Sequence, residues 1–103
     1  MPSPVQHPEY APVHPGEILT EEFLIPLRLT PYAVARRINV PRTRIERLAR
    51  GETPVSVDTA LRLSRFLGTT PQFWLNLQSR FDLLTAEVEA SELDAIDPVS
   101  TAA

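Results

Sequence analysis

Residues 30–51 read TPYAVARRINVPRTRIERLARG and predict two short helices joined by a very short turn. Thr30, which precedes a proline, supplies the hydroxyl and the fixed φ that favour the start of a helix. Asn39 is the non-glycine residue type best suited to a left-handed turn, so the first helix should end there. The second helix should begin near Pro41 and end at Gly51, a residue type common after a helix C-terminus.

The second of these helices has one apolar side and one basic side. Only Asn39 and Val40 separate the two helices, so they must cross steeply, as the helices of a helix-turn-helix do. At 100° per residue the apolar residues of the second helix share one side. These are Ile45, Leu48 and Ala49. The opposite side carries Thr43, Glu46, Arg47 and Arg50, with Arg42 and Arg44 at its edges. We expect these guanidinium groups to point outward, unengaged by carboxylates of the same chain.

A basic helix face of this kind suits the major groove of DNA, which admits one α-helix whose N-terminal residues reach the base edges. The predicted base-contacting residues are Arg42, Thr43, Arg44 and Arg47. The predicted contacts to the phosphate backbone, which position a protein without specifying sequence, are Arg36, Arg37 and Arg50. The alternative is that these arginines only solvate a small helical bundle.

The charge distribution supports a local site for a polyanion. The chain of 103 residues has a net charge of −3, but residues 28–65 contain nine arginines against three acidic residues. Residues 1–27 contain four glutamates and no basic residue, and residues 66–103 contain one arginine against six acidic residues. A basic middle between acidic ends favours nucleic-acid binding by the middle, which the whole-chain charge would not suggest.

The remaining sequence predicts an all-α bundle of five helices, and strand signals are almost absent. The expected helices span about residues 15–24, 31–39, 41–51, 57–67 and 71–90, with Pro26 ending the first. The expected organisation is a flexible proline-rich arm over residues 1–13, one domain over 14–90 and a disordered tail over 91–103. The expected core residues outside the central pair of helices are Ile18, Leu19, Phe23, Val57, Ala60, Leu61, Leu67, Phe73, Trp74, Leu77 and Phe81.

Composition and motifs argue against other classes of function. The chain has no cysteine, which excludes thiol nucleophiles and zinc–thiolate sites. His7 and His14 lack the spacing of a helical metal-binding pair, and the three glycines are isolated at predicted helix ends, where they form no phosphate-binding loop. No apolar run is long enough to cross a bilayer. We therefore expect a cytoplasmic protein that is not an enzyme and has no metal or other cofactor.

Several motifs together resemble those of a known family. They are HPGEIL at 14–19, the VP at 40–41 with RI at 44–45, DTALRL at 58–63, and LGTTPQFWLNLQSRFDL at 67–83. In this combination the chain resembles the HigA-type antitoxins, small bacterial helix-turn-helix proteins of the Xre/Cro class. Many Xre-class proteins have a DNA-contacting glutamine at the second residue of the first helix of the pair, where this chain has Pro31.

The resemblance implies a lambda-repressor-like bundle of five helices that forms a homodimer. It implies that the dimer binds double-stranded operator DNA in its own promoter and represses it. It also implies a toxin partner of the RelE-like class, which cleaves mRNA and is neutralised by direct binding. The alternatives are a stand-alone transcriptional regulator without a toxin, and a protein-interaction module that has lost DNA binding.

Two segments are candidates for contact with a protein partner. The acidic last third has a weak apolar stripe formed by Leu83, Leu84, Val88 and Leu93, which could bind a basic toxin or a second copy of the chain. The proline-rich arm with Tyr10 is the rival segment, because it could become ordered on binding.

Overall fold

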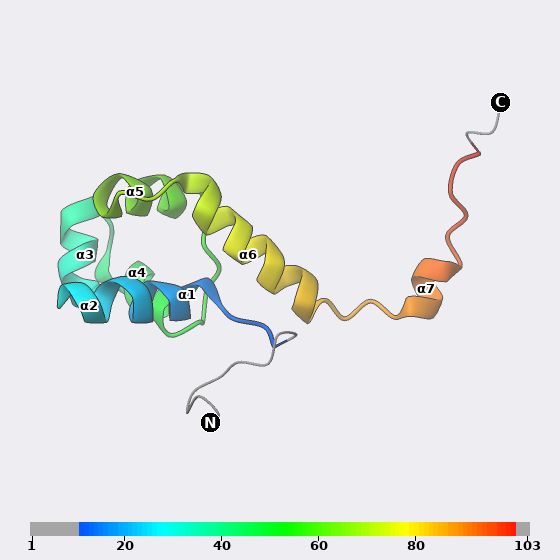
Figure 1. Cartoon of the computed structure of the whole chain (residues 1–103), viewed down its shortest axis with the longest axis horizontal. Coiled ribbons are helices and arrows are strands. Elements are labelled where there is room, and N and C mark those ends of the chain that lie inside the picture. Colours follow the sequence, from blue (N-terminus) through cyan, green and yellow to red (C-terminus); the bar gives the residue numbers. More distant parts are fainter. Residues whose placement is uncertain (1–10, 101–103) are drawn as a thin grey trace, which may run out of the picture.

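A computed structural model describes residues 11–100 of the chain, and all its regular structure in that range is helical (Figure 1). The first helical stretch is continuous and consists of α1, the π-helical segment η1, and α2. The elements are α1 (Pro15–Ile18), η1 (Leu19–Leu24), α2 (Ile25–Leu27), α3 (Pro31–Ile38), α4 (Arg42–Ala49), α5 (Val57–Leu67), α6 (Pro71–Thr85) and α7 (Ala90–Asp94). This confirms the all-α fold with a helix-turn-helix, formed by α3 and α4.

Side-chain caps fix where three of the helices begin. The hydroxyl oxygens of Thr30, Ser56 and Thr70 each accept a hydrogen bond from the backbone N–H three residues later. Each bond satisfies one of the N–H groups that the first turn of a helix leaves unpaired. The predicted starts of α3, α5 and α6 are therefore confirmed.

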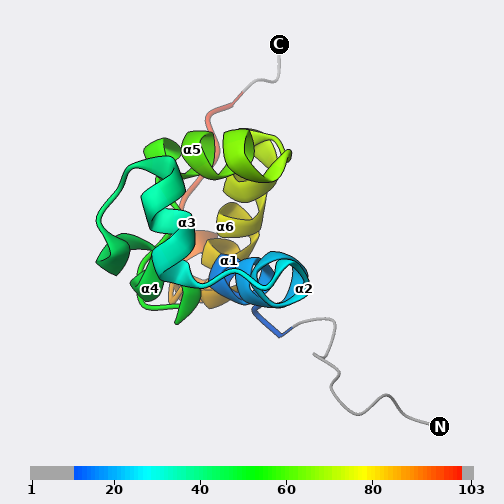
Figure 2. The ribbon, with the colours of Figure 1, turned by 90° about the vertical axis from the view of Figure 1, so that its left-hand side faces the viewer.

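The turn between α3 and α4 depends on a left-handed residue, as expected. Asn39 has φ of 62°, and the N–H of Val40 donates to the carbonyl of Ala35 at 3.0 Å. This pair of features closes the C-terminus of α3 and changes the direction of the chain within two residues. The turn sets α4 steeply across α3, as Figure 2 shows from the side where the two helices face the viewer.

Pro26 does not end the first helical stretch, so that prediction was wrong. The N–H of Ile25 donates to the carbonyl of Thr20, five residues earlier, and this π-type widening makes room for the proline ring in the next turn. The stretch ends instead at Arg28, whose φ is 55°, with Leu29 N–H donating to the carbonyl of Leu24 at 2.8 Å. The helix ends here without the glycine that usually marks such a turn.

The core lies where α1 and η1, α3, α4, α5 and α6 meet. Its fully enclosed side chains include Leu19, Ile45, Leu48, Leu63 and Trp74, and the Nε1–H of Trp74 donates to the hydroxyl of Thr69 at 2.7 Å. The expectation that Trp74 is a core residue is confirmed.

Three of the expected core positions were wrong. Val57 and Leu61 are 59% and 53% exposed, because α5 rests on Thr59, Ala60 and Leu63, which are spaced to share one face. Phe73 is 38% exposed, although its ring still packs edge-on against Trp74 with ring centroids 5.1 Å apart.

The last expected helix is shorter than predicted. It ends at Thr85 and not near residue 90, and the short helix α7 follows it at some distance from the bundle (Figure 1). All residues of 82–100 are exposed. None of the helices in residues 11–100 combines the length and the apolar character needed to cross a membrane. The predicted domain limits at residues 13 and 90 stay predictions, since residues 1–10 and 101–103 lie outside the described range.

The start of α1 is joined closely to the end of α4. His14 caps α1 by accepting the N–H of Gly16 on Nδ1 at 2.9 Å, and its ring packs edge-on against Phe81 of α6. A Cβ atom built on Gly16 would overlap the carbonyl oxygen of Leu48 in α4. At this point only a glycine allows the two helix backbones to approach as they do.

This close approach predicts that Gly16→Ala destabilises the protein. Helix propensity alone would make alanine more stable than glycine here by up to about 1 kcal/mol. We expect a loss of at least about 2 kcal/mol, because the backbones of α1 and α4 must move apart. Urea denaturation checks this, with Gly68→Ala as the control: no atom would lie within 4 Å of the added Cβ, so only its left-handed φ of 78° is strained. A Gly16→Ala protein as stable as the parent would contradict the contact.

The cap formed by His14 predicts a dependence of stability on pH. Burial lowers the pKa of His14 below its ordinary 6.5, against smaller opposing effects from a hydrogen bond with the Thr53 backbone and from Asp82 and Glu17. The folded protein therefore binds this proton less readily than the unfolded chain, so the stability from neutral His14 is complete above pH 6.5 and is lost as the pH falls through the lower folded value.

Thermal melts between pH 8 and 5.5 check this in a pair of proteins that both carry His7→Asn, so that His14 is the only histidine to titrate. The protein that keeps His14 should lose more of its melting temperature over this range than the one with His14→Asn, which retains a capping side chain. Equal losses in the two proteins would show that His14 is not linked to folding.

Candidate nucleic-acid interface

The outward face of α4 carries the predicted DNA-contacting residues. Ile45 and Leu48 are buried on the inner side, as the helical spacing predicted. The side chains of Arg42, Arg44 and Arg50 are 65%, 41% and 60% exposed. Thr43 and Arg47 are exposed as well. The expectation that this helix presents its basic side to solvent is confirmed.

The expectation that these guanidinium groups are unengaged was wrong for three of them. Arg42 lies 3.8 Å from Glu46, Arg44 forms a hydrogen-bonded ion pair with Asp58, and Arg50 donates to Glu52 at 2.8 Å. All three pairs are at the surface, where an ion pair contributes only about 0–1 kcal/mol. Such contacts are weak enough for a DNA phosphate or base to replace them.

Arg47 differs from its neighbours, because none of the residues 11–100 forms an ion pair or hydrogen bond with its side chain. It lines a shallow groove between α4 and the segment that leads into α5. Thr43 and Arg44 line the same groove, together with Thr53 and Ser56. The structure thus brings Thr43, Arg44 and Arg47 together on one side of α4.

The other predicted contacts lie elsewhere on the surface. The guanidinium of Arg36 is 6.0 Å from the ring centre of Tyr32, and that of Arg37 is 4.9 Å from the ring centre of Phe66. Arg37 lines a groove between α3 and α5 with Arg62 and Arg65. Arg50, at the end of α4, lines other grooves, with Thr20 of η1 and with Glu17 of α1. These three arginines therefore do not line the groove of Thr43, Arg44 and Arg47.

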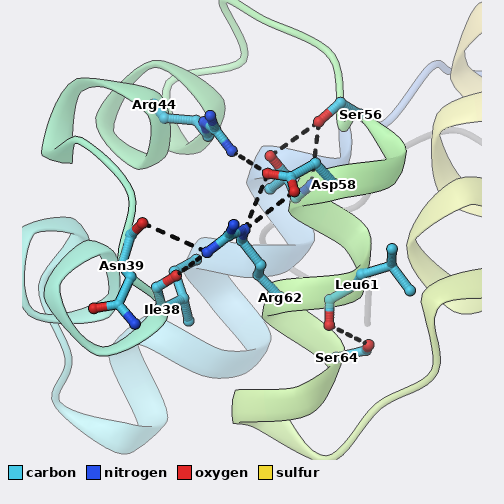
Figure 3. Close-up of polar contacts among 9 residues, drawn as sticks. Ile38, Asn39, Arg44, Ser56, Asp58, Leu61, Arg62 and Ser64 are labelled. Atoms are coloured by element: carbon cyan, nitrogen blue, oxygen red, sulfur yellow. Dashed lines mark hydrogen bonds and ion pairs between the residues drawn. The ribbon is translucent and has the colours of Figure 1, made fainter.

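Sequence reasoning missed Asp58 and Arg62, which connect α3, α4 and α5 (Figure 3). The Nε–H of Arg62 donates to both oxygens of Asp58 at 3.1 Å, and the same carboxylate accepts from Arg44. Their spacing of four residues on a helix could have indicated the Asp58–Arg62 pair. Nothing local in the sequence indicates the pairing of Asp58 with Arg44, fourteen residues away.

The two arginines also affect the ionisation of Asp58. Hydrogen bonds from Arg44 and then Arg62 lower the pKa of this carboxyl below its ordinary value of 3.8. The carboxylate is therefore charged throughout the neutral and mildly acidic range, and both contacts persist there.

Residues 11–100 contain no group of three or more histidine, cysteine or acidic side chains arranged to hold a metal ion. His7, whose spacing from His14 already argued against a metal-binding pair, lies outside this range.

Comparisons with known proteins agree on one family. The helix-turn-helix family matches residues 21–74 of the chain. The chain is 42% identical to virulence-associated protein I of Dichelobacter nodosus over 93 aligned residues. The aligned region covers 90% of this chain and 86% of that protein.

Two solved structures from Pseudomonas aeruginosa have the same fold. One is PA4674 in complex with its operator DNA, with a TM-score of 0.80 and 39% identity, covering 85% of this chain and 97% of that one. The other is the antitoxin HigA with the higBA promoter, with a TM-score of 0.77 and 38% identity, covering 86% and 99%. The match to a helix-turn-helix family and its antitoxins also agrees with the expectation that this chain is not an enzyme.

Proposed function

Because the chain belongs to the helix-turn-helix family of HigA-type antitoxins, we propose that it is a cytoplasmic antitoxin and repressor. As a homodimer it binds operator DNA in its own promoter, and it neutralises a RelE-like toxin by direct contact. The observation that carries the DNA-binding part is the exposed basic side of α4 on a fold that related proteins use with operator or promoter DNA.

In this proposal α4 enters the major groove as the recognition helix. Its first turn brings Arg42, Thr43 and Arg44 to the base edges, and Arg47 follows one turn later on the same side. Arginine donates in pairs to guanine, and threonine contacts a base or a thymine methyl group. Contacts to the phosphate backbone by Arg36, Arg37 and Arg50 give most of the affinity and make it dependent on salt.

The dimer requires a self-complementary surface on each copy of the chain. The end of α6 supplies apolar side chains for it, since Leu83 and Leu84 are exposed. Operator binding by such a dimer requires its two α4 helices to lie in successive major grooves, about 34–36 Å apart.

The toxin-binding part of the proposal rests on the acidic segment after α6. Residues 82–97 contain six acidic residues and no basic one, and Val88 and Leu93 are exposed among them. A RelE-like toxin is basic, so its charge complements this segment. Tyr10 in the arm, the rival docking residue, lies outside the described range.

We expect Arg47→Ala to weaken binding to the operator by about 1–3 kcal/mol and to lower the preference for operator over a scrambled duplex. Fluorescence anisotropy titrations with both duplexes at several salt concentrations measure this. Arg65→Ala is the matched control, because it removes an exposed arginine from α5 that has no proposed contact with DNA. Equal preference in Arg47→Ala and the parent would remove Arg47 from the interface.

The toxin partner is tested by co-expressing the chain with the product of the adjacent gene, followed by co-purification and a growth assay. A variant with Glu87, Glu89 and Glu92 changed to glutamine should lose both co-purification and protection of growth. The control variant, Glu21→Gln with Glu22→Gln, removes exposed acidic residues from η1 and should keep both.

If the variant of Glu21 and Glu22 loses protection of growth and the variant of Glu87, Glu89 and Glu92 keeps it, the toxin docks on the first helical stretch. If the parent binds no adjacent product, the chain is a stand-alone regulator.

A further inference from the structure

The carboxylate of Asp58, which is not among the proposed DNA-contacting residues, binds Arg44, which is one of them. Asp58 lies in the first turn of α5, and it accepts a hydrogen bond from Nη1 of Arg44 across the gap between α5 and α4 (Figure 3). Asp58 is exposed, with 53% of its side chain accessible, so this is a surface contact and not part of the core.

Asp58 is itself held in place by Arg62. The Nε–H of Arg62 donates to both carboxylate oxygens, and Nη1 donates to the backbone carbonyl of Ile38 at 2.8 Å and reaches that of Asn39 at 3.5 Å. These carbonyls belong to the end of α3 and to the left-handed turn that sets the direction of α4. Arg62 therefore fixes the carboxylate relative to the turn of the helix-turn-helix.

Arg44 has donors left over after this contact. Only its Nη1 has a partner among residues 11–100, so the edge formed by Nε and Nη2 stays available. A guanidinium edge with two parallel N–H groups is the geometry that binds guanine O6 and N7 or two phosphate oxygens. An arginine already held at one nitrogen also loses less conformational freedom on binding than an unrestrained one.

We propose that Asp58 is a specificity-determining positioning residue that aims the remaining edge of Arg44 at the base edges of the operator. Arg62 anchors Asp58 to the α3–α4 turn, so that the direction of Arg44 follows the direction of α4. The inference rests on the proposed function, since it takes α4 to be the recognition helix.

Removal of the charge of Asp58 distinguishes the positioning role from a general electrostatic effect on DNA binding. Replacing the carboxylate by an amide removes one negative charge near the interface, which should tighten binding to any duplex. Positioning acts in the opposite direction and only on the operator. The ratio of operator affinity to scrambled-duplex affinity therefore reports positioning, whereas the scrambled duplex alone reports charge.

The test compares Asp58→Asn with Glu52→Gln on the operator and on a scrambled duplex of the same composition. Glu52 also pairs with an exposed arginine beside α4, Arg50, which is proposed to contact only the backbone. Both variants should bind the scrambled duplex at least as tightly as the parent. Asp58→Asn should lower the operator-to-scrambled ratio by roughly three- to tenfold, and Glu52→Gln should leave it unchanged.

Two further variants show whether Asp58 acts through Arg44. In a background with Arg44→Gln, the change Asp58→Asn should have no further effect on the ratio, because the residue that it positions is gone. Asp58→Glu keeps the carboxylate, so its operator-to-scrambled affinity ratio should lie between those of Asp58→Asn and the parent. Thermal melts of every variant show that each is folded.

The outcomes distinguish the inference from the function beneath it. A parent protein that does not prefer the operator would overturn the proposed function. A parent that does, with an unchanged or increased ratio in Asp58→Asn, would overturn the inference alone, and an increase would mean that Asp58 withholds Arg44 from DNA. An equal effect of Asp58→Asn with and without Arg44 would make Asp58 a structural residue only.

Discussion

The backbones of α1 and α4 touch at Gly16 and Leu48, and the way in which α4 faces outward depends on this contact. On one side α4 is held by the turn at Asn39, which fixes its angle to α3. On the other side its last turn rests against the start of α1, which His14 caps. Between these two supports, burial of Ile45 and Leu48 fixes the rotation of the helix about its axis. Because Ile45 and Leu48 face the core, the basic residues on the opposite side of α4 face the solvent.

Local chemistry explains which parts of the fold could be predicted from the sequence. The helix starts at Thr30, Ser56 and Thr70 each depend on a hydroxyl and the backbone N–H three residues later. A few neighbouring residues of sequence are therefore enough to predict them. The wrong predictions have two sources, packing between distant segments and a helical turn of unusual type. The rotation of α5, which exposes Leu61, is set by its neighbours in space, and the helix passes Pro26 because a π-type turn accommodates the ring.

The candidate interface divides in the same way. Helical spacing was enough to predict that Arg42, Arg44, Arg47 and Arg50 share an exposed side, and the structure bears this out. It could not predict their ion pairs, because the partner of Arg44 comes from α5 through the tertiary fold. Nor could it give the role of Gly16, which the sequence marks only as a glycine near a helix start. The roles of these arginines on DNA stay proposals, supported by the family and by the surface that they form.

The central claim, that the outward side of α4 enters DNA, is tested most directly by nuclear magnetic resonance of the arginine side chains. The chain is labelled with nitrogen-15 and titrated with a duplex of its own promoter, and the Nε–H signal of each arginine is followed. The account predicts that the signals of Arg42, Arg44 and Arg47 shift and become protected from exchange with water, while those of Arg28 and Arg65 stay where they are. Protection of Arg28 and Arg65 with unchanged signals from α4 would contradict it.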